Sequence, residues 1–489
     1  MNDIRRTILW VIFGFAMVLL WDKWQVHNGK QATFFPTPAT ATATAPAAGN
    51  SAAVVPAPAP VVSTAAVPTQ QSERAPVARE QVEVTTDVLR LKFDSEGGSL
   101  THAELLKYAD MADKSQNFVL FDESAQRVYV AQTGLIGGNY PNHKTVMTVV
   151  PGARQLKDGQ DSLTVRFESP EMDGIKLVKT WTIQRGAYAV AVQHEVINSG
   201  SASASPQLYL QLVRDGNKPP GESSIYSTFT GPAVYTSEKK YQKVEFKKID
   251  EGKVDIEKSG TDGYVAMVQH YFASAWLLAD GLPRDLFMRK VDTNLYSVGM
   301  ITPLGTLAPG ASKTLDANLF AGPQIEKSME SLTPGLELVK DYGWLTILAK
   351  PLYWLLDKIH SFLGNWGWSI VGLVLLLKIL FYWLNAKAYA SMAKMKAINP
   401  KIVEMRERLK DKPQQIQQEM MRIYREEKVN PMGGCFPIVI QIPVFIALYW
   451  VLLSSVEMRN APWIGWIHDL SSPDQFFIFP VLMTLSSLL

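Results

Sequence analysis

The pattern of apolar residues along the chain predicts membrane-spanning helices in its last quarter. Residues 366–384 (WGWSIVGLVLLLKILFYWL) hold one charge, Lys378. At about 1.5 Å per residue, such a helix is roughly 28 Å long, close to the hydrocarbon thickness of a bilayer. Similar runs at 435–456 and 475–489 predict two more spans, and the second ends without flanking charges, which indicates a span that is cut off.

The N-terminal region predicts an anchor followed by a linker. An apolar run follows Arg5 and Arg6, and no small-residue cleavage site comes after it, so residues 1–27 are expected to be an uncleaved transmembrane anchor with its N-terminus in the cytoplasm. Residues 28–80 are rich in Pro, Ala, Thr and Val and have no periodic apolar face. This composition is typical of a disordered linker.

From residue 81 to 334 the pattern changes to strands with turn signals between them. The stretches 82–93, 161–169 and 207–213 alternate with a period near two, and 176–198 predicts a hairpin that turns at Arg185-Gly186. We therefore expect a large all-β antiparallel sandwich, outside the cytoplasm because it follows the anchor. The chain has one cysteine, Cys435, so no disulfide within the chain can stabilise this sandwich.

Candidate catalytic residues in the sandwich are few. His194 and Glu195 are neighbours on a predicted strand, so their side chains point to opposite faces and cannot form one site. His270 lies among aromatic residues and is interpreted as a hydrogen-bonded core histidine. Paired carboxylates, a nucleophile elbow and metal-ligand spacing are absent from the sequence pattern. The domain is therefore expected to be a scaffold or a binding surface, and not an enzyme.

Residues 335–363 are apolar but interrupted by charges, so they are unsuited to crossing a bilayer. They suit an amphipathic helix at the outer membrane–water boundary, hinged at Pro351, with a docking helix in a globular unit as the alternative. The charged or ionisable residues that interrupt it include Lys340, Asp341, Lys350, Asp357, Lys358 and His360.

Residues 385–431 predict a basic helical hairpin, with a net charge of +5 from eleven basic and six acidic residues. Apolar stripes at helical spacing predict two helices that meet near Asp411 and Pro413, with a kink at Pro400 in the first. The stripes are Met392, Met395, Ile398, Ile402, Met405 and Leu409, then Ile416, Met420 and Ile423. The basic side chains expected to form a contact surface are Lys394, Lys401, Arg406, Arg408, Lys410, Arg422 and Arg425.

Loop charges predict the orientation of the spans. The loop 457–474 has a net charge of −2, against +5 for the hairpin. Positive loops stay in the cytoplasm, so the hairpin is expected inside and the sandwich and acidic loop outside. The position of Lys378 leaves two interpretations open, because a lysine at a span's centre costs about 2.5–3.5 kcal/mol. Its ammonium either extends to the membrane surface or faces a wet cavity within the membrane.

Three stretches carry a resemblance to a known family: 391–409 (SMAKMKAINPKIVEMRERL), 430–452 (NPMGGCFPIVIQIPVFIALYWVL) and 263–277 (GYVAMVQHYFASAWL). Together they resemble the YidC family of membrane protein insertases of Gram-negative inner membranes. The resemblance implies a β-supersandwich periplasmic domain, an outer amphipathic helix and five insertase-core helices around a groove open to cytoplasm and lipid. It also implies that the fifth core helix, one wall of the groove, is absent from this chain.

The resemblance gives roles to individual residues. It puts Lys378 where the family has the positive charge of its groove, with Arg in most members, and Tyr382 at a groove-lining tyrosine. Gln441, the strongly polar residue of the 435–456 span, is added from its position as a groove-wall residue.

The resemblance also implies the partners: nascent membrane proteins as substrates, the ribosome on the cytoplasmic side, the Sec translocon and the lipid bilayer. No specific nucleic acid sequence and no cofactor are expected. One alternative is a secondary transporter or channel, although the spans lack carboxylates that could pair with Lys378. The other is a membrane-anchored periplasmic carbohydrate-binding protein.

Overall fold

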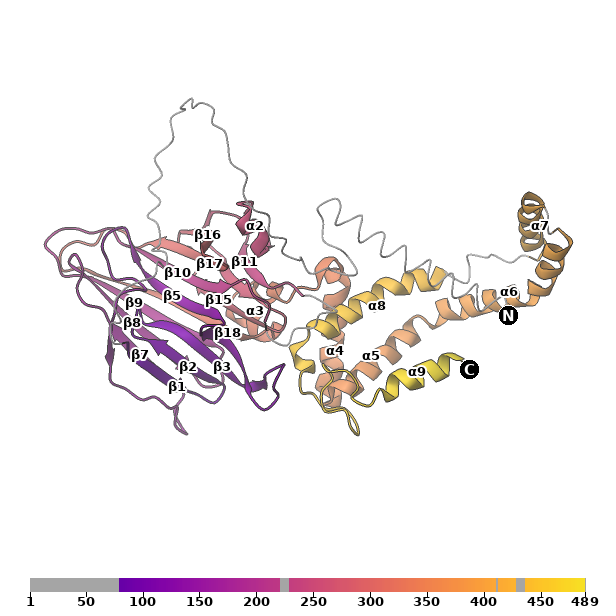
Figure 1. Cartoon of the computed structure of the whole chain (residues 1–489), viewed down its shortest axis with the longest axis horizontal. Helices are drawn as coiled ribbons and strands as arrows, with labels where there is room; N and C mark the ends of the chain where they lie inside the picture. The colour runs from indigo at the N-terminus through magenta and orange to yellow at the C-terminus, as the bar shows by residue number, and fades with distance from the viewer. Residues whose placement is uncertain (1–78, 220–227, 410–411, 428–435, 489) are drawn as a thin grey trace, which may run out of the picture. The chain divides into compact units, whose positions relative to one another are not determined.

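The computed structural model describes residues 79–219, 228–409, 412–427 and 436–488, which form two compact units that meet in sequence at Gly322 and Pro323 (Figure 1). The predicted anchor, nearly all of the predicted linker, Cys435 and Lys410 lie outside the described residues. Each unit is described by itself.

The first unit is built from two antiparallel sheets, and the described residues supply nine strands to each (Figure 1). The predicted all-β sandwich is thereby confirmed. One sheet has the order β1 (Gln81–Thr85), β2 (Leu89–Asp94), β3 (Ser99–Ala109), β4 (Asn117–Glu123), β5 (Val128–Ile136), β10 (Gln207–Asp215), β17 (Leu295–Pro303), β16 (Arg284–Asp292) and β13 (Ser259–Gly260). The other has the order β12 (Lys240–Lys243), β11 (Gly231–Thr236), β14 (Tyr264–Val268), β15 (Phe272–Leu278), β18 (Ser312–Pro323), β9 (Ala189–Asn198), β8 (Ile175–Gln184), β7 (Ser162–Glu168) and β6 (Thr148–Val150), and a short helix, α2 (Phe246–Asp250), follows β12.

The core of the sandwich lies between the two sheets. The predicted alternation in β7 turns Leu163, Val165 and Phe167 inward, and all three are buried. Trp181 and Trp276 are fully buried, with ring centroids 6.1 Å apart. Burying an aromatic side chain of this size stabilises the fold by roughly 1.5–3 kcal/mol. Such residues hold the two sheets together in the absence of a disulfide.

Turn residues set the limits of the strands. The predicted hairpin over 176–198 is confirmed: β8 and β9 pair antiparallel, with Ile183 opposite Val190. Gly186 in its turn has a φ of 72°, a conformation that favours glycine. The stretch 82–93, by contrast, contains two strands, because the Thr86 hydroxyl accepts a hydrogen bond from the Leu89 amide (3.0 Å) and closes a turn. Alternation alone gives no sign of this turn.

The second unit is helical. Its elements are α3 (Glu326–Leu332), two 3₁₀ turns η1 (Leu336–Val339) and η2 (Gly343–Leu345), α4 (Thr346–Leu363), α5 (Trp366–Leu380), α6 (Tyr382–Arg408), α7 (Pro413–Glu426), α8 (Phe436–Ser454), η3 (Val456–Met458) and α9 (Ile478–Leu488) (Figure 1). A shared apolar core joins α4, α5 and α8. Its buried members include Leu352 and Leu356 from α4, Leu373 from α5, and Ala447 and Val451 from α8.

The amphipathic segment is helical over only part of its predicted range. Gly335 (φ 87°) and Gly343 (φ 65°) have left-handed backbone conformations that interrupt the predicted helix. Residues 336–339 and 343–345 therefore form two separate 3₁₀ turns, and α4 begins at Thr346. The helix then runs through Pro351 without a break. It buries one face in the shared core, and the opposite side exposes Ile347, Trp354 and Phe362.

The single helix predicted over 366–384 is divided at Phe381, where α5 ends and α6 begins. Among the described helices, none is alone both long enough and apolar enough to cross a bilayer. The pair α5 and α6 meets that requirement together, with a 64° bend at the junction.

The helices α6 and α7 pack against each other as a hairpin. Ile398, Ile402 and Met405 of α6 are buried in their contact, and α6 is continuous through Pro400. The partly buried residues around them are Met395, Leu409, Ile416, Met420, Ile423 and Tyr424. The apolar spacing in the sequence therefore predicted which faces of the two helices pack together. Met392 of the predicted stripe is an exception, because it is exposed.

Candidate polar groove between α5 and α8

Lys378 and Gln441 line the same small cavity, one from α5 and the other from α8. The cavity has a volume of about 20 Å³, which is the room that roughly one water molecule needs. Its lining consists of Val374, Leu377, Lys378 and Phe381 together with Gln441, Val444 and Phe445. One ammonium and one amide thus face a hollow that is otherwise apolar.

Helical spacing explains why these residues converge. On α5 and its end, positions 374, 377, 378 and 381 follow the i, i+3, i+4, i+7 pattern of one helix face. On α8, positions 441, 444 and 445 follow the same rule. The only polar groups on these two faces are the side chains of Lys378 and Gln441.

Lys378 forms no ion pair with another described residue. The sequences of α5 and α8, the two helices that line the cavity, contain no Asp or Glu. The side chain is exposed at the surface of the unit. An ammonium in this position can attract an anionic group that comes from outside the protein, because no carboxylate of these helices neutralises it.

Asn385 is a neighbour of the cavity that the sequence did not single out. Gln441 Nε2 donates a hydrogen bond to Asn385 Oδ1 on α6, at 3.1 Å. Helical spacing from Lys378 could not have found it, because the break at Phe381 separates the two residues. The contact connects the amide of α8 to the helix that follows the Lys378 helix.

Tyr382 is not brought together with Lys378 and Gln441. It follows the break at Phe381, is 72% exposed, and does not line the cavity. Phe381 lines the cavity instead. Of the three residues expected to line the groove, the described structure brings together two, Lys378 and Gln441.

The basic residues of the hairpin differ in whether an ion pair within the protein neutralises their charge. Lys401 forms an ion pair with Glu427 at 2.5 Å, and Arg422 forms one with Glu426 at 2.7 Å. Lys394, Arg408 and Arg425 are exposed and form no ion pair with another described residue, whereas Arg406 lies 3.7 Å from the sulfur of Met420. Ion pairs thus occupy two of the nine basic residues of the hairpin that the structure describes, so most of its positive charge remains available.

His194 and His270, the two candidate histidines from the sequence, are buried in the sandwich. His194 is fully buried, and its Nε2 lies 2.9 Å from the Thr133 hydroxyl. Burial and the nearby Lys179 ammonium lower the pKa of His194 to about 3, so the ring is neutral at neutral pH. His270 is buried and lies 2.7 Å from the hydroxyl of Thr228 through its Nδ1, as expected of a hydrogen-bonded core histidine.

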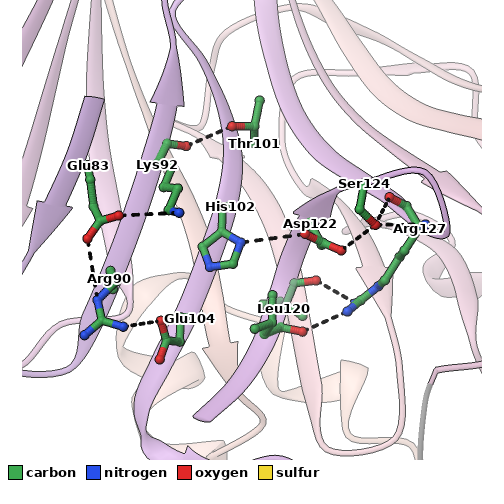
Figure 2. Close-up of polar contacts among 11 residues, drawn as sticks. Glu83, Arg90, Lys92, Thr101, His102, Glu104, Leu120, Asp122, Ser124 and Arg127 are labelled. Carbon is green, nitrogen blue, oxygen red and sulfur yellow. Dashed lines mark hydrogen bonds and ion pairs between the residues drawn. The ribbon is translucent and has the colours of Figure 1, made fainter. Parts of the chain in front are cut away.

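His102, Asp122 and Ser124 form a contact series that the sequence did not single out (Figure 2). His102 Nδ1 lies 3.8 Å from Asp122, and the Ser124 hydroxyl donates to the other oxygen of Asp122 at 3.0 Å. A catalytic triad needs the histidine between the carboxylate and the hydroxyl. Here the carboxylate lies in the middle, so the histidine cannot take the serine proton.

The same part of the sheet carries a ladder of cross-strand ion pairs (Figure 2). Arg90 on β2 pairs with Glu104 on β3 at 2.7 Å and lies 3.8 Å from Glu83 on β1, which also pairs with Lys92 at 3.4 Å. Opposite charges on neighbouring strands stabilise a sheet by roughly 0.2–1 kcal/mol each. The ladder is thus accounted for by sheet stability. In the described residues, no cluster of His, Cys, Asp and Glu is suited to hold a metal ion.

Comparison with known proteins decides the family. The family described as "YidC periplasmic domain" matches residues 81–355, and the one described as "60Kd inner membrane protein" matches residues 358–489. The chain belongs to the YidC family of membrane protein insertases. Membrane protein insertase YidC of Cupriavidus metallidurans is 53% identical over 99% of this chain and 87% of its own length. The YidC of Ralstonia nicotianae is 54% identical, with the same coverage of both chains.

Solved structures resemble the sandwich only weakly. A galactose mutarotase related enzyme from Lactobacillus acidophilus has a TM-score of 0.32 and 9% identity, covering 50% of this chain and 97% of that one. A protein of Escherichia coli that is described as an aldose 1-epimerase has a TM-score of 0.28 and 10% identity. The match covers 50% of this chain and 99% of that one. Similarity at this level carries no information on what the sandwich binds.

Membership in the YidC family confirms the expected fold class, function and location. The protein is a membrane protein insertase of the inner membrane, with a periplasmic β domain and a helical membrane core, and it is not an enzyme. The alternatives of a transporter and of a carbohydrate-binding protein are set aside. Its substrates are membrane proteins.

Proposed function

We propose that the insertase receives the polar end of an incoming membrane protein in the hollow beside Lys378 and Gln441. The observation that carries the proposal is the convergence of one ammonium and one amide, from two helices, on a hollow with apolar walls. A positive, hydrated site within the membrane shortens the path of a polar segment through hydrocarbon, where unsatisfied polar groups are costly.

The driving force is hydrophobic partitioning of the client's apolar helix into lipid. Lys378 contributes a Coulomb attraction to acidic client tails, which is about 1–4 kcal/mol for a pair of charges ~4 Å apart at effective dielectrics between those of water and a protein surface. An arginine would bind a carboxylate through two parallel hydrogen bonds, whereas the lysine ammonium acts as a point charge. The attraction therefore places few demands on the geometry of the client.

The hairpin of α6 and α7 is proposed to be the cytoplasmic contact surface for the ribosome or the nascent chain. Support comes from the exposed cations that have no ion pair of their own, Lys394, Arg408 and Arg425. The Sec translocon is proposed as a partner for clients whose large loops cannot pass through so small a hollow. The exposed apolar face of α4 is proposed to lie at the outer membrane boundary.

Photo-cross-linking tests whether clients reach this hollow. A photoreactive residue in place of Gln441 or Phe445 should capture a client during insertion. The matched control is Leu375, which is on α5, is 61% exposed and does not line the cavity. Equal capture from Leu375 and Gln441 would mean that clients pass along the surface of the helices without entering the hollow.

A further inference from the structure

The second unit contains a buried lysine, Lys340, that does not line the cavity between α5 and α8. Lys340 lies between η1 and η2, and its side chain is 0% exposed. Its ammonium is 3.4 Å from Glu457 Oε2 in η3 and 3.9 Å from the centroid of the Tyr353 ring in α4. Tyr353 in turn donates its hydroxyl hydrogen to Glu457 Oε1, at 2.6 Å. One carboxylate thus receives both a buried ammonium and a buried phenol.

A second tyrosine extends this group toward α3. Tyr342 is buried, and its hydroxyl donates to Glu326 Oε1 at 2.5 Å. Its ring lies 6.4 Å from the ring of Tyr353 and 5.8 Å from the Lys340 ammonium. The contacts connect four elements that are distant in sequence: α3, the 3₁₀ segment before α4, α4 itself, and η3 after α8.

A buried ion pair of this kind fixes position. A charge removed from water has to keep its partner, because the uncompensated charge left by a separation is strongly destabilising. The ring of Tyr353 also attracts the ammonium through its π face. Sliding of the end of α8 along α4 would therefore break the contacts of a buried ammonium.

We infer that Lys340, Tyr353 and Glu457 are positioning residues, which fix the C-terminal end of α8 against α4 and thereby hold Gln441 opposite Lys378. The inference rests on the proposed function of the groove. Gln441 precedes Ser454, the last residue of α8, by thirteen residues. At ~1.5 Å per residue this is a lever of roughly 20 Å, so a tilt of about 10° at the fixed end displaces Gln441 by roughly 3 Å. That displacement is comparable to the width of a water-sized cavity.

The test measures the distance between α5 and α8 in the full chain. Cys435 is replaced by Ser, and cysteines are introduced at Leu377 and Val444, which line the cavity from the two helices. A short bifunctional thiol reagent then reports their proximity. A second pair, at Ile359 on α4 and Gly372 on α5, reports whether the rest of the core is intact, since a Cβ at Gly372 would lie 3.3 Å from the Ile359 side chain.

We expect Glu457→Gln, which leaves the Lys340 ammonium buried and unpaired, to lower the 377–444 cross-link about threefold or more while the 359–372 cross-link persists. Lys340→Met should act in the same direction. The double variant should recover most of the yield, because it leaves no buried charge. The control is Lys327→Met, which removes an exposed ion pair with Asp357 (2.8 Å) and should change neither cross-link.

An unchanged 377–444 cross-link in both single variants would overturn the inference, and so would an equal loss of both cross-links. Client insertion is measured on the same proteins. A variant that loses the 377–444 cross-link but inserts acidic-tailed clients normally would contradict the proposed role of the groove while supporting the positioning role of the buried pair.

Discussion

His194 shows which properties of a single residue follow from the sequence and which depend on its surroundings. It pairs across the strands with Lys179, whose ammonium donates to the carbonyl oxygens of Gly97 (2.5 Å) and Thr133 (2.8 Å). Burial lowers the pKa of Lys179 to about 7. The sequence separates His194 from Glu195 correctly, but it does not indicate that two basic side chains lie side by side within the core. That proximity depends on the pairing of β8 with β9 and on the sheet that covers them.

The buried His194 predicts acid sensitivity of the sandwich. Its pKa is about 3 in the folded protein and near 6.5 when unfolded, so the unfolded chain binds more protons between these values. Stability should therefore be lost as the pH falls from about 6.5 to 3. His194→Gln should reduce this loss by up to roughly 3 kcal/mol, which urea unfolding of the full chain at pH 7 and pH 4 would measure. An unchanged pH dependence would show that His194 is accessible to protons in the folded state.

At the scale of the helices, the apolar pattern predicts the contact between α6 and α7 but not the break between α5 and α6. The stripes of α6 and α7 located their contact, because a helix buries residues at three- and four-residue spacing. The break at Phe381 had no such signal, since phenylalanine is compatible with a helix interior and the run 366–384 is apolar throughout. The pairing of Lys340 with Glu457 was also invisible, because the two residues are 117 positions apart.

The start of α5 depends on a glycine. A Cβ at Gly367 would lie 2.2 Å from the Trp463 ring, which stacks on Phe479 of α9 at 5.7 Å. Gly367→Val should displace Trp463 and destabilise the helical unit by about 1–3 kcal/mol, through overpacking. Gly372→Ala is the control, because its added methyl meets the ends of two side chains, Ile359 at 3.3 Å and Leu363 at 3.8 Å. Thermal unfolding of the full chain would compare the two, and equal effects would argue against close packing at Trp463.

At the scale of the whole molecule, the membrane core is expected to work without most of the sandwich. The sandwich has its own core between two sheets, and its cross-strand ion pairs and buried histidines are accounted for by its stability. By contrast, α4 contributes Ala349, Leu352 and Leu356 to the core that also holds α5 and α8. The sequence predicted a boundary at residue 335 from the change of pattern. The two compact units meet instead at Gly322 and Pro323, and the helix α3 (Glu326–Leu332) already belongs to the second unit.

Two deletions test this division of the molecule. Removing residues 100–320 should leave client insertion largely intact. Removing 335–363 should abolish it, because the faces of α5 and α8 that α4 covers would become exposed. Insertion by each protein would be measured at matched amounts in the membrane. Loss of insertion by the sandwich deletion, with its membrane core stably present, would contradict the scaffold role of the sandwich.

The most direct test of the groove is the effect of Lys378 substitutions on clients that differ only in the charge of their translocated tail. In liposomes containing the full chain, Lys378→Arg should insert both clients nearly normally, because the positive charge is kept. Lys378→Ala should impair the acidic-tailed client more, by roughly five- to a thousandfold for a lost attraction of about 1–4 kcal/mol. Lys378→Glu should be worse still for that client. Equal defects for acidic and neutral tails would contradict the groove-charge mechanism.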